Sequence, residues 1–142
     1  MLQTMLSTTC HCTRLRRAAH AVTRLYDEAL AATGLTVTQF SLLRTISRLD
    51  EPYITTLAEA TGLERSTLGR NLRPLEKAGL VVFLPGRDSR TRLVRLSRQG
   101  MRALDRAIPQ WEAAQKKVAG LLGEGHVEQL TTLLEELIDS PP

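Results

Sequence analysis

The chain has 142 residues with a formal net charge of +4, and 42% of them are hydrophobic, 24% charged and 4% aromatic. This balance is typical of a single folded subunit, argues against disorder and favours helices over a β-sandwich. Because the longest apolar run, Leu80–Leu84, is far shorter than the ~20 residues of a membrane span and we find no signal peptide, we expect a cytoplasmic protein without membrane contact.

Two helices are predicted before Pro52. Apolar residues three or four apart indicate a first helix over 15–30, and Gly34 ends it as a left-handed residue. Thr36 and Gln39 fit a capping box, which opens a second helix. Pro52 ends that helix, because the residue before a proline is disfavoured in helical geometry.

A short and a longer helix follow, joined by a tight turn. The capping-box pattern Thr56–Glu59 predicts the start of the short helix, which stops at Gly62, where a positive φ is needed. The longer helix is predicted over Glu64–Ala78, with Pro74 kinking or shortening it. Four leucines lock the pair together as a helix-turn-helix: Leu57, Leu63, Leu68 and Leu72.

This packing leaves a polar face on the longer helix. Its N-terminus offers unpaired N–H groups and a positive dipole to phosphates. Ser66 and Thr67 are short enough to let the helix approach base edges, and Arg70 reaches a base or a phosphate. Arg65 and Arg73 complete the expected contacts with double-stranded DNA.

A β-hairpin is predicted directly after the helix-turn-helix. The runs 80–84 and 92–96 have strand character, and turn residues separate them. At the tip, Asp88 would hold Arg90 by a bidentate pair and present it to the minor groove, with Arg92 nearby. A helix-turn-helix followed by an arginine-tipped hairpin is a winged helix-turn-helix. The alternative interpretation of this segment is a helical hairpin followed by a solvated turn.

The charge distribution agrees with a winged DNA-binding unit. From Glu64 to Arg106 there are eleven basic and four acidic residues, a net +7, whereas the rest of the chain carries −3. Ten of the eleven are arginines, whose planar guanidinium suits phosphates and guanine edges. On charge alone a solvated basic face is an equal alternative. We expect phosphate contacts from Arg65, Arg73, Arg92 and Arg95.

The last third of the chain is predicted as two helices. Ser97 caps a long helix reaching Leu122, bent by Pro109, and the last helix covers His126–Ile138 after a glycine turn. A small chain has little interior for so many apolar stripes, so we expect a homodimer, the alternative being an intramolecular core. The partner-facing residues would be Leu30, Val127, Leu130, Leu134 and Leu137.

The chain resembles the MarR-type winged helix-turn-helix transcription regulators from about residue 12 to 138. The markers are Gly34-Leu35-Thr36 leading into Gln39-Phe40, Leu57–Leu63, Leu75–Val81, and Asp88-x-Arg90 followed by Leu96-Ser97-x-x-Gly100, where the family more often has Leu-Thr. The resemblance implies a mostly α fold with a small β-hairpin wing, in which 36–97 form the DNA-binding lobe and the helices of 10–33 and 98–138 dimerise. By position it implies DNA contacts from Ser66, Thr67, Arg70, Asp88, Arg90 and Arg92.

Cys10-His11-Cys12 precedes the first helix, whose dipole would lower a thiol pKa. Three alternatives remain: an inert pair, thiol oxidation, or metal binding with His20, although a zinc site usually needs four ligands. We expect no cofactor. An enzyme is disfavoured because the sequence has no glycine-rich phosphate loop, no paired carboxylates in a plausible cleft and no metal-ligand set.

Trp111 is the only tryptophan, and it either packs at an interface or lines a pocket for an aromatic effector. The resemblance implies phenolic or carboxylate effectors, for which Arg17, His20 and Arg44 are candidate anion partners. The sequence therefore predicts a homodimeric regulator of a pseudo-palindromic operator, acting as a repressor released by a small aromatic or anionic effector or by thiol oxidation. The alternative is a protein-interaction module that docks an acidic partner on its arginine face.

Overall fold

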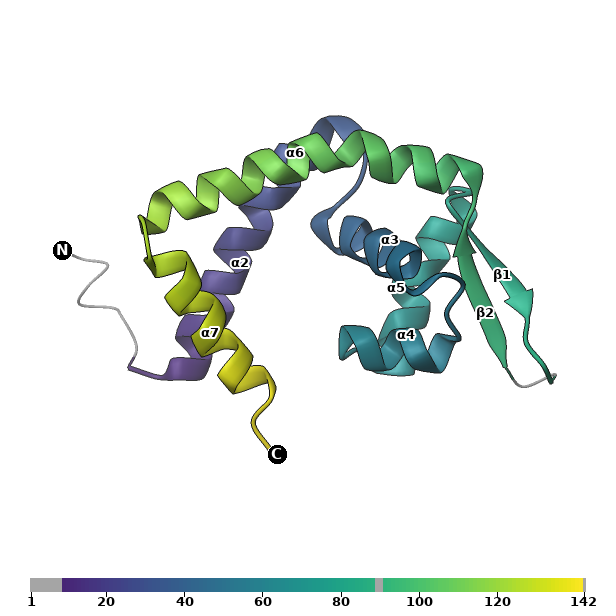
Figure 1. Cartoon of the computed structure of the whole chain (residues 1–142), viewed down its shortest axis with the longest axis horizontal. Helices are drawn as coiled ribbons and strands as arrows, with labels where there is room; N and C mark the ends of the chain where they lie inside the picture. The colour runs from purple at the N-terminus through teal and green to yellow at the C-terminus, as the bar shows by residue number, and fades with distance from the viewer. Residues whose placement is uncertain (1–8, 89–90, 142) are drawn as a thin grey trace.

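The computed structural model describes residues 9–88 and 91–141, which fold into two lobes joined by one long helix (Figure 1). In chain order the elements are α2 (His11–Leu30), the 3-10 helix η1 (Ala31–Thr33), α3 (Val37–Leu49), α4 (Ile54–Thr61), α5 (Arg65–Lys77), β1 (Val81–Pro85), β2 (Arg92–Leu96), α6 (Arg98–Leu122) and α7 (His126–Ile138). We call α3, α4, α5 and the two strands the winged lobe. The helical lobe comprises α2, α7 and the C-terminal half of α6, and α6 arches over both lobes.

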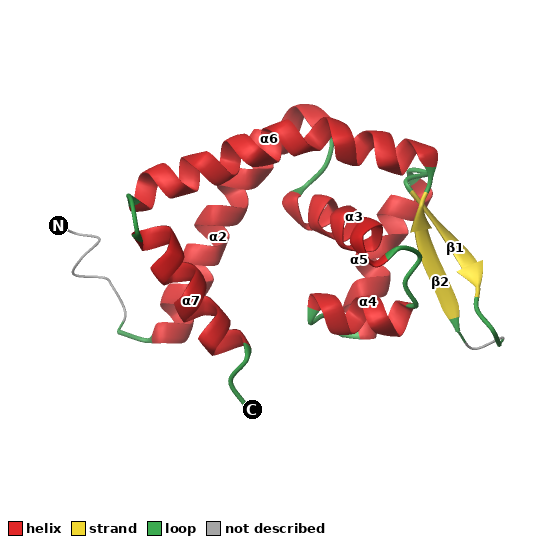
Figure 2. Cartoon of the chain, in the orientation of Figure 1, coloured by secondary structure: helices red, strands yellow, loops and turns green. Residues whose placement is uncertain are grey.

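The fold is mostly helical, and the sheet of the described residues is the antiparallel pair β1–β2 (Figure 2). Val81 pairs with Leu96 and Pro85 with Arg92, so β1 lies one residue later than the predicted run 80–84. The predicted helix-turn-helix and hairpin wing are confirmed. Among the described residues, no helix is long and apolar enough to cross a membrane.

The hydrophobic core fills the winged lobe and continues under the first half of α6. It includes Phe40 and Ile46 of α3, Val94 of β2 and Ala107 of α6, each at most 1% exposed. Leu30 is also fully buried in this core, because the end of α2 packs against α3 and α6. The prediction that Leu30 faces a partner chain is therefore wrong.

Two predicted helix caps are confirmed and one is wrong. Thr36 and Gln39 form a reciprocal capping box at α3, and the Ser97 hydroxyl accepts from the Gly100 amide at the start of α6. Thr56 does not cap α4, which already begins at Ile54. The reason is tertiary: Tyr53 forms a β-bridge with Leu93, so the chain is extended up to Tyr53 and turns helical directly after it.

Both internal prolines lie within unbroken helices. α5 continues through Pro74 to Lys77, and α6 continues through Pro109 to Leu122. Both prolines are on exposed faces, where water can satisfy the carbonyl group that loses its amide partner. Pro74 therefore shortens α5 by no more than one residue relative to the predicted end at Ala78.

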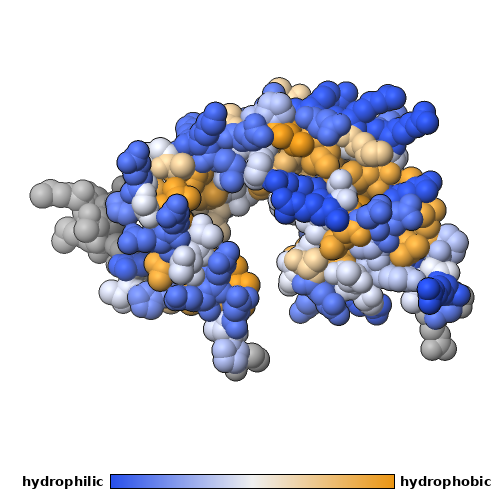
Figure 3. Space-filling view, viewed as in Figure 1, coloured by the Kyte–Doolittle hydropathy of each residue, from blue (hydrophilic) through white to orange (hydrophobic). Residues whose placement is uncertain are grey.

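The helical lobe leaves much apolar surface exposed in the single chain. α7 has no buried residue, although Leu130 and Leu134 lie on its predicted apolar stripe. Leu15 and Val22 of α2 and Leu121 of α6 are exposed as well. Figure 3 shows apolar atoms at the surface of this lobe. Single apolar residues scattered over the surface are normal in a monomer, whereas here many of them lie together in one lobe.

Candidate nucleic-acid interface

The turn between α4 and α5 has the geometry that the helix-turn-helix requires. Gly62 adopts a φ of 70°, a left-handed conformation that is unfavourable for residues with a side chain. Leu57 of α4 and Leu68 of α5 are fully buried on either side of this turn. Glu64, the N-cap of α5, makes no side-chain capping bond, so the first turn of α5 keeps its electropositive end for an anion.

The outer face of α5 presents the predicted DNA contacts to solvent. Arg65, Ser66, Arg70 and Arg73 are exposed, and Thr67 is half-buried. The Arg70 guanidinium donates a hydrogen bond to the Thr67 hydroxyl at 3.4 Å between Nη2 and Oγ1. This contact brings two of the predicted DNA-contacting side chains together on the outer face of α5.

The wing is braced near its tip by hydrogen bonds that involve Thr91. The Gly86 amide donates to the Thr91 carbonyl at 2.8 Å, and the Thr91 amide donates to the Asp88 carbonyl at 3.3 Å. Asp88 is exposed there. Arg90 lies outside the described residues, so its predicted pairing with Asp88 stays a prediction.

Arg92 is the first residue of β2, next to the tip of the wing, and its position is fixed by an aromatic ring. Its guanidinium carbon lies 4.9 Å from the centroid of the Phe83 ring on the neighbouring strand. Such cation–π contact holds a guanidinium in place while leaving its N–H donors available. Arg92 is exposed and therefore suited to a backbone phosphate.

The wing and the helix-turn-helix are joined by the segment before α4. The Val94 amide of β2 donates to the Pro52 carbonyl at 3.0 Å, next to the Tyr53–Leu93 bridge. A hollow of about 360 Å³ lies at this junction and is lined by Tyr53, Ile54, Thr55, Arg65, Thr91 and Arg92. It brings the first residue of α5 and the tip end of β2 to one concave, basic surface.

The sequence analysis missed Tyr53, Thr55 and Thr91 as parts of this surface. From the sequence, Pro52 is interpreted only as the end of a helix. In the fold, Pro52 begins a short extended segment that pairs with β2. No local pattern signals that pairing, because its two strands are some forty residues apart in the sequence.

Arg95 differs from the other predicted phosphate contacts. Its Nη1 atom lies 3.6 Å from Oε1 of Glu51, and both side chains are about half exposed. A solvent-exposed pair of this kind contributes little to stability. Arg95 therefore faces the loop after α3 rather than the hollow that Arg65 and Arg92 line.

The two cysteines lie at the start of α2 and carry exposed thiols rather than a disulfide. Hydrogen bonds from Thr13, first from its side chain and then from its backbone, lower the pKa of Cys10. Across residues 9–88 and 91–141 there is no group of three or more His, Cys, Asp or Glu side chains that could hold a metal ion. Nothing in this geometry supports the metal-binding alternative.

The structure brings together two of the four predicted effector-site residues. The Arg44 guanidinium lies 4.1 Å above the centroid of Trp111, whose ring also stacks on Phe40 at 5.5 Å and 24°. Arg17 and His20 instead line a separate hollow on α2. Within the chain the four residues do not form one site.

Tyr26 and Gln115 join α2 to α6. The Tyr26 hydroxyl donates a hydrogen bond to Oε1 of Gln115. Burial raises the pKa of Tyr26, so this hydroxyl stays protonated and remains a donor at neutral pH.

Comparison with known proteins finds relatives of this chain among transcription regulators. The sequence pattern of the MarR family matches residues 35–91. An uncharacterized HTH-type transcriptional regulator of Bacillus cereus is 33% identical over 102 residues, which cover 72% of this chain and 68% of that protein.

Two solved structures align over nearly the whole chain. The M. tuberculosis transcriptional regulator MosR, in complex with DNA, is 37% identical with a TM-score of 0.81, over 92% of this chain and 96% of that one. CouR from Rhodococcus jostii RHA1, bound to p-coumaroyl-CoA, is 24% identical with a TM-score of 0.77, over 94% and 95%. The second likeness concerns the fold alone.

Proposed function

The chain belongs to the MarR family of winged helix-turn-helix transcription regulators and binds DNA, and we propose that it acts as a homodimeric repressor released by an effector. The observation that carries the proposal is the common hollow lined by Arg65 of α5 and Arg92 of the wing. A surface of this shape and charge suits the sugar-phosphate backbone beside a recognition helix. Family membership sets aside the alternatives of an enzyme and of a protein-docking module.

Dimerisation would use the apolar surface of the helical lobe. Its exposed large apolar residues are Leu15, Val22, Leu121, Leu122, Leu130, Leu133, Leu134, Leu137 and Ile138. A two-fold pair would bury this surface and set two copies of α5 about 34 Å apart, one turn of DNA. The operator would then be a pseudo-palindrome, and the protein would work in the cytoplasm.

The test of DNA recognition is selection of bound fragments from genomic DNA, followed by titration of the best fragment at several salt concentrations. If the dimer neutralises ~6–10 phosphates, its affinity falls by ~10³–10⁵ between 50 and 200 mM salt. Fragments sharing an inverted repeat support the proposal. Equal binding of all duplexes would contradict sequence-specific regulation.

The effector we propose is a small aromatic or anionic molecule that competes for the Arg44–Trp111 contact. An aromatic carboxylate can replace Arg44 as a neighbour of the indole and pair with the released guanidinium. The p-coumaroyl-CoA complex of CouR is a parallel from a protein of the same fold. Arg17 and His20 would contribute only through a different hollow.

Thiol oxidation is a second route of release, and one observation favours it. Cys10 and Cys12 are exposed, and the lowered pKa of Cys10 raises its thiolate fraction, which is the form that oxidants attack. Treating the protein with hydrogen peroxide should weaken DNA binding reversibly in wild type and not in Cys10→Ser. Equal loss in both would exclude Cys10 as the sensor.

A further inference from the structure

The exposed large apolar residues of the described chain fall into two groups. Nine lie in the helical lobe, on the surface assigned above to dimerisation. The other three are Leu49, Val82 and Met101, which are 39%, 36% and 50% exposed. They belong to the end of α3, to β1 and to the first turns of α6, far from the helical lobe (Figure 1). Dimerisation does not account for these three.

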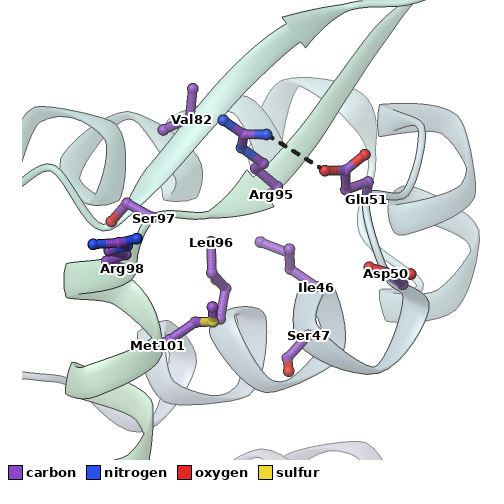
Figure 4. A pocket seen from close by; sticks show the side chains of 10 residues that line it. All are labelled: Ile46, Ser47, Asp50, Glu51, Val82, Arg95, Leu96, Ser97, Arg98 and Met101. Carbon is purple, nitrogen blue, oxygen red and sulfur yellow. Dashed lines mark ion pairs between the residues drawn. The ribbon is translucent and has the colours of Figure 1, made fainter.

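Val82 and Met101 line one hollow of about 480 Å³, and Leu49 directly precedes its lining residue Asp50. Figure 4 shows the hollow between the end of α3, the base of the wing and the start of α6. Ile46 and Leu96 complete its apolar surface. Its volume lies within the ~300–1,000 Å³ typical of small-molecule sites.

The charged residues of this hollow are separated by sign. Arg95 and Arg98 come from the wing and α6, whereas Asp50 and Glu51 come from the loop after α3 (Figure 4). Glu51 pairs with Arg95 at 3.6 Å. Within the part of the chain that the structure describes, the Arg98 guanidinium and the Asp50 carboxylate make no ion pair or side-chain hydrogen bond.

The loop that carries the two acids has an unusual backbone. Asp50 and Glu51 are the positive-φ residues other than glycine in the described chain, at 53° and 55°. Two consecutive residues in this region are unfavourable, and such backbone is found most often at binding sites and turns under functional constraint. This conformation places Asp50 and Glu51 along the rim of the hollow.

We propose that this hollow binds a small dipolar organic molecule, with an anionic group at Arg98, a cationic group at Asp50 and an apolar body over Val82, Leu96 and Met101. A ligand of this class matches both charges and covers the apolar surface that the fold leaves exposed. A molecule with one charge would leave the opposite residue without a partner. The site shares no lining residue with the Arg44–Trp111 contact.

Ligand bound here would contact the loop after α3, the wing and α6 together. Since Arg95 and Val82 are wing residues, the ligand would favour one orientation of the wing relative to α3. Any change in DNA affinity must be matched by an equal change in ligand affinity, because coupling between two sites is reciprocal. This consequence rests on the proposed function, whereas ligand binding itself does not.

The test uses the full-length protein without DNA and three probes of one size. The probes are 4-(aminomethyl)benzoate, which carries both charges at opposite ends of a ring, benzoate and benzylamine. Binding is followed by the methyl resonance of Met101, assigned with Met101→Leu, and by calorimetry. We expect the dipolar probe to shift the Met101 resonance and to bind about tenfold more tightly than either single-charge probe, or ~1.4 kcal/mol.

Two variants localise the charges, and a third is the control. Arg98→Ala should remove the preference over benzylamine, and Asp50→Asn should remove the preference over benzoate, since Asn tolerates a positive φ. Arg102→Ala removes the same charge one turn along α6 and should bind like wild type. The proposal is overturned if the dipolar probe binds no better than the other two, if Met101 does not respond, or if Arg98→Ala and Asp50→Asn change nothing.

Discussion

Gly100 lies so close to the carbonyl oxygen of Leu80 that a Cβ atom at position 100 would overlap it. The same carbonyl accepts a hydrogen bond from the Ser97 amide at 3.0 Å, and the Ser97 hydroxyl donates to the carbonyl of Gly79. These contacts join the first turn of α6 to the entrance of the wing. They explain physically why the segment Leu96-Ser97-x-x-Gly100 requires a small capping residue and a glycine.

Gly100→Ala should therefore destabilise the protein by about 1–3 kcal/mol, the usual range for overpacking a closed site. Gly69→Ala is the matched control, because nothing lies within 4 Å of a Cβ at that helical position. Alanine should stabilise α5 there by about 0.5–1 kcal/mol. Chemical denaturation at one protein concentration measures both changes, and equal unfolding midpoints would contradict the close approach.

Arg92→Ala should weaken operator binding, because a phosphate contact is lost. The slope of log affinity against log salt concentration should fall by about 1 for each Arg92 removed. Arg102→Ala removes an equal charge on α6, outside the hollow, and should leave both quantities unchanged. Fluorescence anisotropy with a labelled operator at several salt concentrations gives both values. Arg90→Ala, predicted from the sequence, should also reduce affinity without affecting dimerisation.

Leu130→Lys should separate the proposed dimer. Burying an unpaired ammonium costs several kcal/mol, so we expect association to weaken ~100-fold or more. Leu49→Lys is the control, since Leu49 and Leu130 are both 39% exposed but lie in different lobes. Sedimentation analysis should show a monomer only for Leu130→Lys. A monomeric wild type would refute the assignment of the α7 face.

Arg44→Ala should change the fluorescence of Trp111, which is the sole tryptophan and therefore reports on one environment. We expect aromatic acids such as salicylate to alter the emission of wild type and to bind Arg44→Ala about tenfold more weakly, or ~1.4 kcal/mol. Arg17→Ala is the control, because Arg17 lines the separate hollow on α2. An equal response of wild type and Arg44→Ala would remove Arg44 from the effector site.

Cys10 should be alkylated faster than Cys12 near neutral pH. Its lowered pKa means that its thiolate persists to lower pH, so the pH profile of its reaction with iodoacetamide should be displaced downward. Single-cysteine variants Cys12→Ser and Cys10→Ser report on each thiol. Thr13→Val, which removes the hydrogen-bonding hydroxyl, should move the Cys10 profile upward, and an unchanged profile would show that Thr13 has no such effect.

Much of the fold follows from interactions between residues close in sequence. The capping box at Thr36, the cap at Ser97 and the left-handed Gly62 are contacts or conformations within a few residues, so their patterns can be read directly. The leucines of α5 repeat with the helical period and are buried as expected. The arginine-rich face of α5 and the wing were predictable for the same reason.

Only the tertiary structure decided the features that depend on distant segments. The start of α4 is set by pairing between Tyr53 and Leu93, and Leu30 is buried because α2 ends against α3 and α6. Arg44 contacts Trp111, which lies 67 positions later in the sequence, whereas His20 lines a separate hollow on α2. Periodicity reports which face of a helix is apolar, but which element covers that face depends on how the helices pack against one another.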